Sequence, residues 1–198
     1  MESVLTVPLA ARVPPLEMHS LPHLTLVLGG ARSGKSRYAE AMIEESAMSA
    51  VYLATAEARD GEMAERIARH RARRAAGQSA IRWRTVEEPL ALAECLVGLA
   101  RPDHPILVDC LTLWLSNLML AGRDVAAETA GLVAAIPSLA GPVVLVANEV
   151  GLGIVPDTPL GRAFRDYAGF LNQSLAAVAD HVVFLAAGLP LVLKQAKR

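Results

Sequence analysis

The chain has 198 residues, 53% of them apolar, which suits one ordinary domain with a sizeable core. Nineteen Lys and Arg against 20 Asp and Glu leave a net charge of -1 and no basic field, so general nucleic-acid binding is disfavoured. Two cysteines, Cys95 and Cys110, are too few for a disulfide framework and lack metal-ligand spacing. The ordinary interpretation of these two cysteines is that they are small buried side chains in a protein of a reducing compartment.

Two segments bear on targeting and membrane insertion. The charge-free run 129–148 is long enough to span a bilayer, but Pro137, Gly141 and Pro142 interrupt it, which favours a helix end, a turn and a buried strand. The first 20 residues lack the basic start and apolar stretch of a signal peptide. We therefore expect a cytoplasmic protein without a membrane span, with an irregular extension over 1–22 and a single α/β domain over 23–198.

Short apolar runs alternate along the chain with longer segments of helical pattern. Such runs, bounded by turn residues, are typical of strands buried on both faces of a parallel sheet. The predicted strands are 24–29, 50–56, 105–110, 142–148 and 181–187. The predicted helices are about 36–47, 62–75, 88–100, 124–136 and 158–179, with Pro89 placed at a helix N-terminus. This order predicts a doubly wound sheet flanked by helices.

The loop after the first predicted strand matches G-x-x-x-x-G-K-[ST] at every fixed position. Its residues are Gly29, Gly30, Ala31, Arg32, Ser33, Gly34, Lys35 and Ser36. In such a loop, backbone N–H groups and the start of the next helix surround phosphate oxygens. Lys35 is expected to neutralise the β and γ phosphates, and Ser36 to offer its hydroxyl to Mg²⁺.

A phosphate loop needs a carboxylate for the metal, commonly at the end of another buried strand. Asp109 follows the apolar run 106–108 and is the best candidate, although it could instead cap the next segment. Glu149 is a second acid at a strand end. With Asn148 it either faces the same crevice or starts a turn.

The segment 62–74 combines an apolar stripe with five arginines around His70. A solvated basic face is the ordinary interpretation of such a segment. Alternatively, a neutral imidazole can attack phosphorus while neighbouring guanidiniums neutralise a triphosphate.

Seven ordered motifs between residues 24 and 194 resemble those of the bifunctional adenosylcobinamide kinase / adenosylcobinamide-phosphate guanylyltransferase family. They are GGARSGKS, YLATA, EMAERIARHRARR, WRTVEEP, LVDCLTLWLSNL, NEVGLGIVP and GRAFRDYAGFLNQSLA. The first is shared by many NTPases, whereas the whole set in this order is far more specific. The resemblance implies an α/β P-loop NTPase fold with a RecA-like, mostly parallel sheet.

The resemblance also implies two reactions and their participants. A nucleoside triphosphate, ATP or GTP, phosphorylates adenosylcobinamide with Mg²⁺, and GMP from GTP is then transferred onto the product through a guanylyl-histidine at His70. It places nucleotide contacts on the phosphate loop, on Ala54, Thr55 and Ala56, on Arg71, Ala72, Arg73 and Arg74, and on Glu87 and Asp109. Ser36 and Asp109 are the expected metal ligands, and family members form homo-oligomers.

Two other functions stay open on the residues alone. One is a P-loop small-molecule kinase in which the basic segment only covers phosphates. The other is a RecA-like NTPase that moves a partner, although a nearly neutral chain of this size shows no charged groove for one. Gly151 and Gly153 allow either an ordinary connection or a loop that approaches a ligand, and the family resemblance favours a substrate-facing loop. Trp114 lies in an apolar stretch, so we expect it to pack in the core and not to stack on a ligand.

Overall fold

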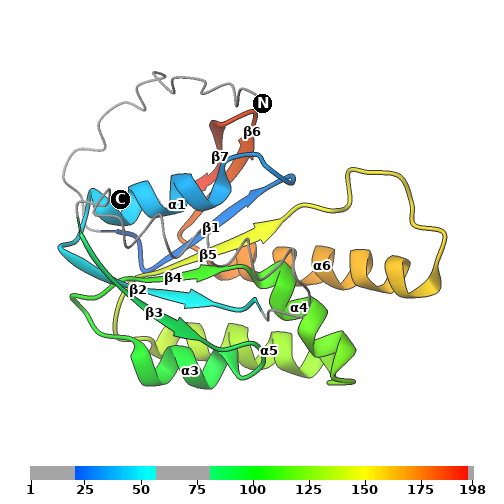
Figure 1. Cartoon of the computed structure of the whole chain (residues 1–198), viewed down its shortest axis with the longest axis horizontal. Coiled ribbons are helices and arrows are strands. Elements are labelled where there is room, and N and C mark those ends of the chain that lie inside the picture. The colour runs from blue at the N-terminus through cyan, green and yellow to red at the C-terminus, as the bar shows by residue number, and fades with distance from the viewer. Residues whose placement is uncertain (1–20, 57–80, 196–198) are drawn as a thin grey trace, which may run out of the picture.

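The computed structural model describes residues 21–56 and 81–195, which form a helix-flanked sheet (Figure 1). The seven strands are β1 (Leu24–Gly29), β2 (Ser49–Ala54), β3 (Arg82–Glu87), β4 (Ile106–Asp109), β5 (Val143–Asn148), β6 (His181–Ala186) and β7 (Leu189–Gln195). They lie in the order β3-β2-β4-β5-β1-β6-β7. All neighbours are parallel except β6 and β7, so the expected mostly parallel sheet is confirmed.

Helices cover both faces of the sheet. The described helices are α1 (Lys35–Glu44), α3 (Leu92–Leu99), α4 (Leu111–Leu120), α5 (Val125–Ala135) and α6 (Pro159–Val178), with a short 3-10 turn at Ile136–Ser138. Among them, α1 packs on one face, while the other four share the apolar cluster of the opposite face (Figure 1). The continuous apolar runs of β1, β4 and β5 are buried because both of their faces are covered.

Three elements differ from the sequence prediction. β3 was not predicted, because it is an edge strand in which Trp83 and Val86 are partly buried and the other residues are exposed and mostly charged. β7 was not predicted either; it is an exposed antiparallel edge strand that contains Pro190. α4 was missed because its apolar side chains directly follow the apolar strand β4.

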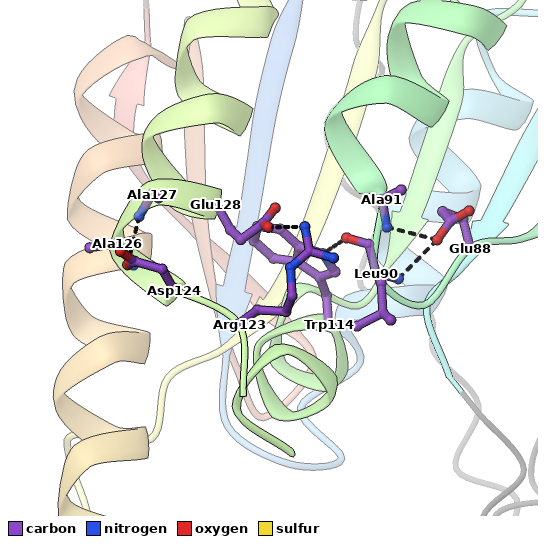
Figure 2. Close-up of polar contacts among 9 residues, drawn as sticks. All are labelled: Glu88, Leu90, Ala91, Trp114, Arg123, Asp124, Ala126, Ala127 and Glu128. Carbon is purple, nitrogen blue, oxygen red and sulfur yellow. Dashed lines mark hydrogen bonds and ion pairs between the residues drawn. The ribbon is translucent and has the colours of Figure 1, made fainter. Parts of the chain in front are cut away.

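The turn before α3 corrects the predicted role of Pro89. The helix begins at Leu92, so Pro89 lies in the turn and not at the first helical position. Instead, the Glu88 carboxylate accepts the backbone N–H groups of Leu90 and Ala91 at 2.9 and 2.7 Å (Figure 2). The buried Trp114 indole donates to the Leu90 carbonyl at 2.8 Å, which confirms that this tryptophan is a packing residue.

Caps and apolar packing fix the segment between β4 and β5. Asp124 caps α5 by accepting the N–H groups of Ala126 and Ala127, and Arg123 forms an ion pair with Glu128 (Figure 2). The run 129–148 is the end of α5, the 3-10 turn and buried β5, as predicted. Within 21–56 and 81–195, no helix combines the length and apolar character needed to cross a membrane.

Candidate nucleotide-binding site

The phosphate loop joins β1 to α1 at the carboxyl edge of the sheet, as the motif predicts. Lys35 is almost buried, and its ammonium donates to the Gly30 carbonyl at 2.6 Å. The Ser33 hydroxyl is buried and has no hydrogen-bond partner among the described residues. Arg32 has a φ of 57°, a conformation that is rare outside glycine and that often marks a ligand-binding turn. The loop therefore holds a cation and a hydroxyl donor beside the amino end of a helix, where anions bind.

Two close contacts fix the shape of this loop. Gly29 has a φ of +151°, and a Cβ atom there would lie 2.5 Å from the Leu185 carbonyl oxygen and 2.7 Å from the Ser33 hydroxyl. The Gly188 N–H, in the turn between β6 and β7, donates to the Ser33 carbonyl at 3.1 Å. The unpredicted hairpin of β6 and β7 thus supports the loop from one side.

The carboxyl ends of four other parallel strands lie along the same edge. Ala54 is in register with Glu87 on one side and with Asp109 on the other, and Asp109 is in register with Val146 of β5. Glu87 on β3 is four strands from β1, or about 19 Å at the usual spacing between strands. If the loop holds the phosphates of a nucleotide, Glu87 lies at a distance that suits contact with the nucleoside and not with the phosphates.

Asp109 ends β4 and is held by a neighbouring strand. Its Oδ2 atom accepts the Tyr52 hydroxyl at 2.8 Å. The residue before α4 is Cys110, with no side-chain cap, so the alternative role of Asp109 as a helix cap is wrong. Both cysteines are free thiols, and burial, with the neighbouring Asp109 charge, raises the pKa of Cys110 to about 11.

The segment 54–56 is locked to the start of α4. The fully buried Thr55 hydroxyl donates to the Cys110 carbonyl at 2.7 Å and accepts the Cys110 N–H at 3.0 Å. Asn117, buried in the middle of α4, donates to the carbonyls of Thr55 and Pro89 at 2.8 and 3.2 Å. Sequence reasoning missed Tyr52 and Asn117; an amide inside the apolar run of α4 was the available signal, since buried polar groups need partners.

The loop after β5 lies next to the phosphate loop. The Glu149 N–H donates to the Gly29 carbonyl at 3.0 Å, and the Asn148 N–H donates to the Thr112 hydroxyl at 2.7 Å. A cavity of about 410 Å³ separates the two loops, and its wall includes Glu149 and Leu152. The Gly151 N–H donates to the Glu149 carboxylate at 2.5 Å, whereas Gly153 has open space around it, and an approach of either glycine to a ligand stays a prediction.

The described residues account for only part of the predicted site. The phosphate loop, the 54–56 segment, Glu87 and Asp109 share one edge of the sheet. The predicted helix 62–75 lies outside the described residues, and so do His70, Arg71, Ala72, Arg73 and Arg74. Ser36 and Asp109 supply oxygen ligands of the type that Mg²⁺ prefers, and no cluster of three or more His, Cys, Asp or Glu side chains occurs within 21–56 and 81–195.

The parallel sheet, the phosphate loop and the strand-end carboxylate define the class: this is a P-loop NTPase with a RecA-like sheet. A solved protein from Pyrococcus horikoshii has a similar fold, with a TM-score of 0.51 at 11% identity over 91% of this chain and 90% of that one. Residues 25–193 match the family model for cobinamide kinase / cobinamide phosphate guanyltransferase. The chain belongs to this family.

Two curated relatives agree with that membership. A Pseudomonas aeruginosa protein described as bifunctional adenosylcobalamin biosynthesis protein CobP is 50% identical over 171 residues, which cover 85% of this chain and 96% of the relative. An Escherichia coli protein, described as bifunctional adenosylcobalamin biosynthesis protein CobU, is 41% identical over 186 residues. That match covers 86% of this chain and 99% of the relative.

Proposed function

We propose that this enzyme phosphorylates adenosylcobinamide and then guanylylates the product, as a step of adenosylcobalamin biosynthesis. The observation that carries the proposal is the phosphate loop at the same sheet edge as Asp109, in a chain whose family is described by these two activities and whose relatives are described as bifunctional adenosylcobalamin biosynthesis proteins. In the first reaction, the hydroxyl oxygen of adenosylcobinamide attacks the γ phosphorus of a nucleoside triphosphate, and the nucleoside diphosphate leaves. Lys35 neutralises charge on the transferring group.

We further propose that Ser36 and Asp109 hold Mg²⁺ together with the phosphates. A magnesium ion usually takes one or two protein oxygens and completes its octahedron with substrate phosphates and water, so two protein ligands suffice. Tyr52 supports this role, because its hydrogen bond fixes the orientation of the Asp109 carboxylate.

The second reaction is proposed to pass through a guanylyl-histidine at His70. The imidazole attacks the α phosphorus of GTP and pyrophosphate leaves; the phosphate oxygen of the corrinoid then displaces the imidazole to give adenosylcobinamide-GDP. A covalent intermediate divides one displacement into two easier ones. The arginines Arg71, Arg73 and Arg74 follow His70 directly and supply charge for the phosphoryl oxygens and the departing pyrophosphate.

Labelling tests the histidine. The protein is incubated with GTP labelled at the α phosphate, and the His70→Ala variant is compared with His104→Ala, a matched control before β4. We expect acid-labile, base-stable protein label in wild type and control, and none in His70→Ala. Label that persists in His70→Ala removes the intermediate, and a wild type that has kinase activity but never takes label supports the kinase without nucleotidyl transfer.

The kinase half is tested with Lys35→Ala. Loss of this preorganised cation is expected to lower the phosphorylation rate by on the order of 10²- to 10³-fold. Lys194→Ala is the control, because that ammonium binds the carbonyls of Ala176 and Ala177 on α6 and lies on β7, outside the phosphate loop. Equal rates in the two variants would contradict the assignment of Lys35.

We also propose that copies of the chain associate. The support is the edge strand β7, whose side chains Leu189, Leu191, Val192 and Leu193 are 50 to 59% exposed. An exposed apolar edge strand offers backbone and side chains for pairing. Light scattering on the wild type and on Leu191→Lys is expected to show an oligomer that the variant weakens.

A further inference from the structure

The loop between β5 and α6 exposes a group of large aliphatic side chains. Leu152 is 80% exposed, Ile154 96% and Val155 53%. Single apolar residues on a surface are ordinary, whereas a group of three within four positions of one loop is typical of a binding surface. We refer to Leu152, Ile154 and Val155 as the aliphatic lip.

The aliphatic lip adjoins the phosphate loop. Leu152 and Glu149 line the 410 Å³ cavity together with residues 30–33 of the phosphate loop. The loop leaves the carboxyl edge of the sheet after β5 and extends beyond it before α6 returns along the sheet (Figure 1). A molecule resting on the lip would therefore have the phosphate loop within reach of a side arm.

Both ends of this loop are fixed by hydrogen bonds. At its start, the Glu149 carboxylate accepts the Gly151 N–H, and the Glu149 N–H binds the phosphate loop at Gly29. At its end, the Arg162 guanidinium donates to the carbonyls of Pro156 and Asp157 at 3.1 and 2.8 Å. The hydrogen bonds restrain the two ends of the loop that carries the lip, and restraint that exists before binding lowers the entropic cost of binding.

The aliphatic character of the lip suits one of the two substrates of the proposed reaction better than the other. A nucleoside triphosphate is anionic, and the phosphate loop, Lys35 and Asp109 already supply the groups that would bind its phosphates and their metal. The three aliphatic side chains of the lip offer a nucleotide neither charge nor an aromatic surface. The acceptor is a broad corrin ring with a flexible arm that ends in the reacting hydroxyl. A ring with its amide side chains is too large for a 410 Å³ cavity, but the arm alone can enter it.

We propose that the aliphatic lip is the docking surface for the corrin ring, from which the arm enters the cavity beside the phosphate loop. This inference rests on the proposed function. Binding removes Leu152 and Ile154 from water, which favours association in proportion to the apolar area covered. A corrin ring docked on the lip can take part in both reactions, because the phosphate added in the first reaction is carried on the same arm.

The test compares the double variant Leu152→Ser with Ile154→Ser against two controls. The first control is Met48→Ser with Val97→Ser, which removes side chains 80 and 53% exposed, one just before the amino end of β2 and the other on α3. The second is Leu152→Met with Ile154→Met, which keeps the lip apolar. Kinase rates give KM for adenosylcobinamide and for the nucleotide separately, and light scattering gives the oligomeric state.

The expected result is a rise in corrinoid KM of about 10-fold in the serine double variant, with nucleotide KM and kcat within about twofold of wild type. Both controls should keep the wild-type corrinoid KM. An unchanged corrinoid KM in the serine variant overturns the inference, and if its oligomer also dissociates the lip is a contact between copies instead. A wild type that phosphorylates no corrinoid overturns the proposed function itself, which is a separate and distinguishable failure.

Discussion

The Tyr52 hydroxyl donates a 2.8 Å hydrogen bond to Oδ2 of Asp109 and so connects β2 to the carboxylate at the end of β4. Tyr52 is only 5% exposed, and its ring packs edge-on against Trp83 with centroids 6.2 Å apart. A rigid aromatic donor therefore sets the orientation of the candidate metal ligand.

Tyr52→Phe removes that donor and keeps the packed ring. We expect the Mg²⁺ concentration for half-maximal kinase rate to rise about 10-fold, because hydrogen-bond partners of metal ligands typically contribute 10- to 100-fold to metal affinity. The measurement is the Mg²⁺ dependence of the rate at saturating nucleotide. Tyr38→Phe on α1 is the control and should leave this dependence unchanged; equal curves for the two variants would contradict a role of Tyr52 in orienting Asp109.

Thr55→Val is expected to destabilise the protein by about 2 kcal/mol, because the fully buried Thr55 hydroxyl is the acceptor of the Cys110 N–H, whereas the Cys110 carbonyl keeps the N–H groups of Leu113 and Trp114. Urea unfolding followed by circular dichroism measures the change. Thr55→Ser keeps the hydroxyl and should recover most of the loss. A valine variant as stable as the wild type would contradict a stabilising role of these hydrogen bonds, because valine keeps the methyl group of Thr55 and loses only its hydroxyl.

Gly29→Ala and Gly30→Ala form a matched pair within the phosphate loop. At Gly29 the added methyl meets the Leu185 carbonyl at 2.5 Å and the φ of +151° disfavours any side chain, whereas at Gly30 it meets nothing within 4 Å. We expect Gly29→Ala to lower the free energy of unfolding by about 1 to 3 kcal/mol and Gly30→Ala to leave it nearly unchanged. Thermal unfolding without nucleotide measures the melting temperatures of the two variants. Equal melting temperatures would show that the loop relaxes around the methyl group added at Gly29.

The parts of the fold that sequence reasoning predicted share a physical origin. Strands buried on both faces, such as β1 and β5, have continuous apolar sequences that can be recognised locally. The phosphate loop is likewise recognised from the local spacing of its glycines and lysine. β3 and β7 are edge strands with exposed side chains, so tertiary pairing and not local pattern makes them strands.

The candidate site follows the same division. The positions of Lys35 and Asp109 were predictable, because Lys35 belongs to the loop motif after β1 and Asp109 ends the apolar strand β4. Tyr52 and Asn117 were not, since their partners lie 57 and 62 positions away along the chain and only the strand order brings them together. The roles of His70 and of the arginines after it stay predictions, because that segment lies outside the described residues.

His181, half-buried at the start of β6, predicts a pH dependence of stability. Burial lowers the pKa of its imidazole, against a smaller opposing effect of the Lys194 backbone. The unfolded chain keeps the ordinary histidine pKa of about 6.5. The contribution of His181 to the free energy of unfolding is therefore fully present above pH 6.5 and is lost as the pH falls through the lower pKa of the folded state. Urea unfolding between pH 7.5 and pH 5 should show a smaller loss of stability in His181→Gln than in wild type. Parallel curves for the two proteins would mean that His181 titrates alike in the folded and unfolded states.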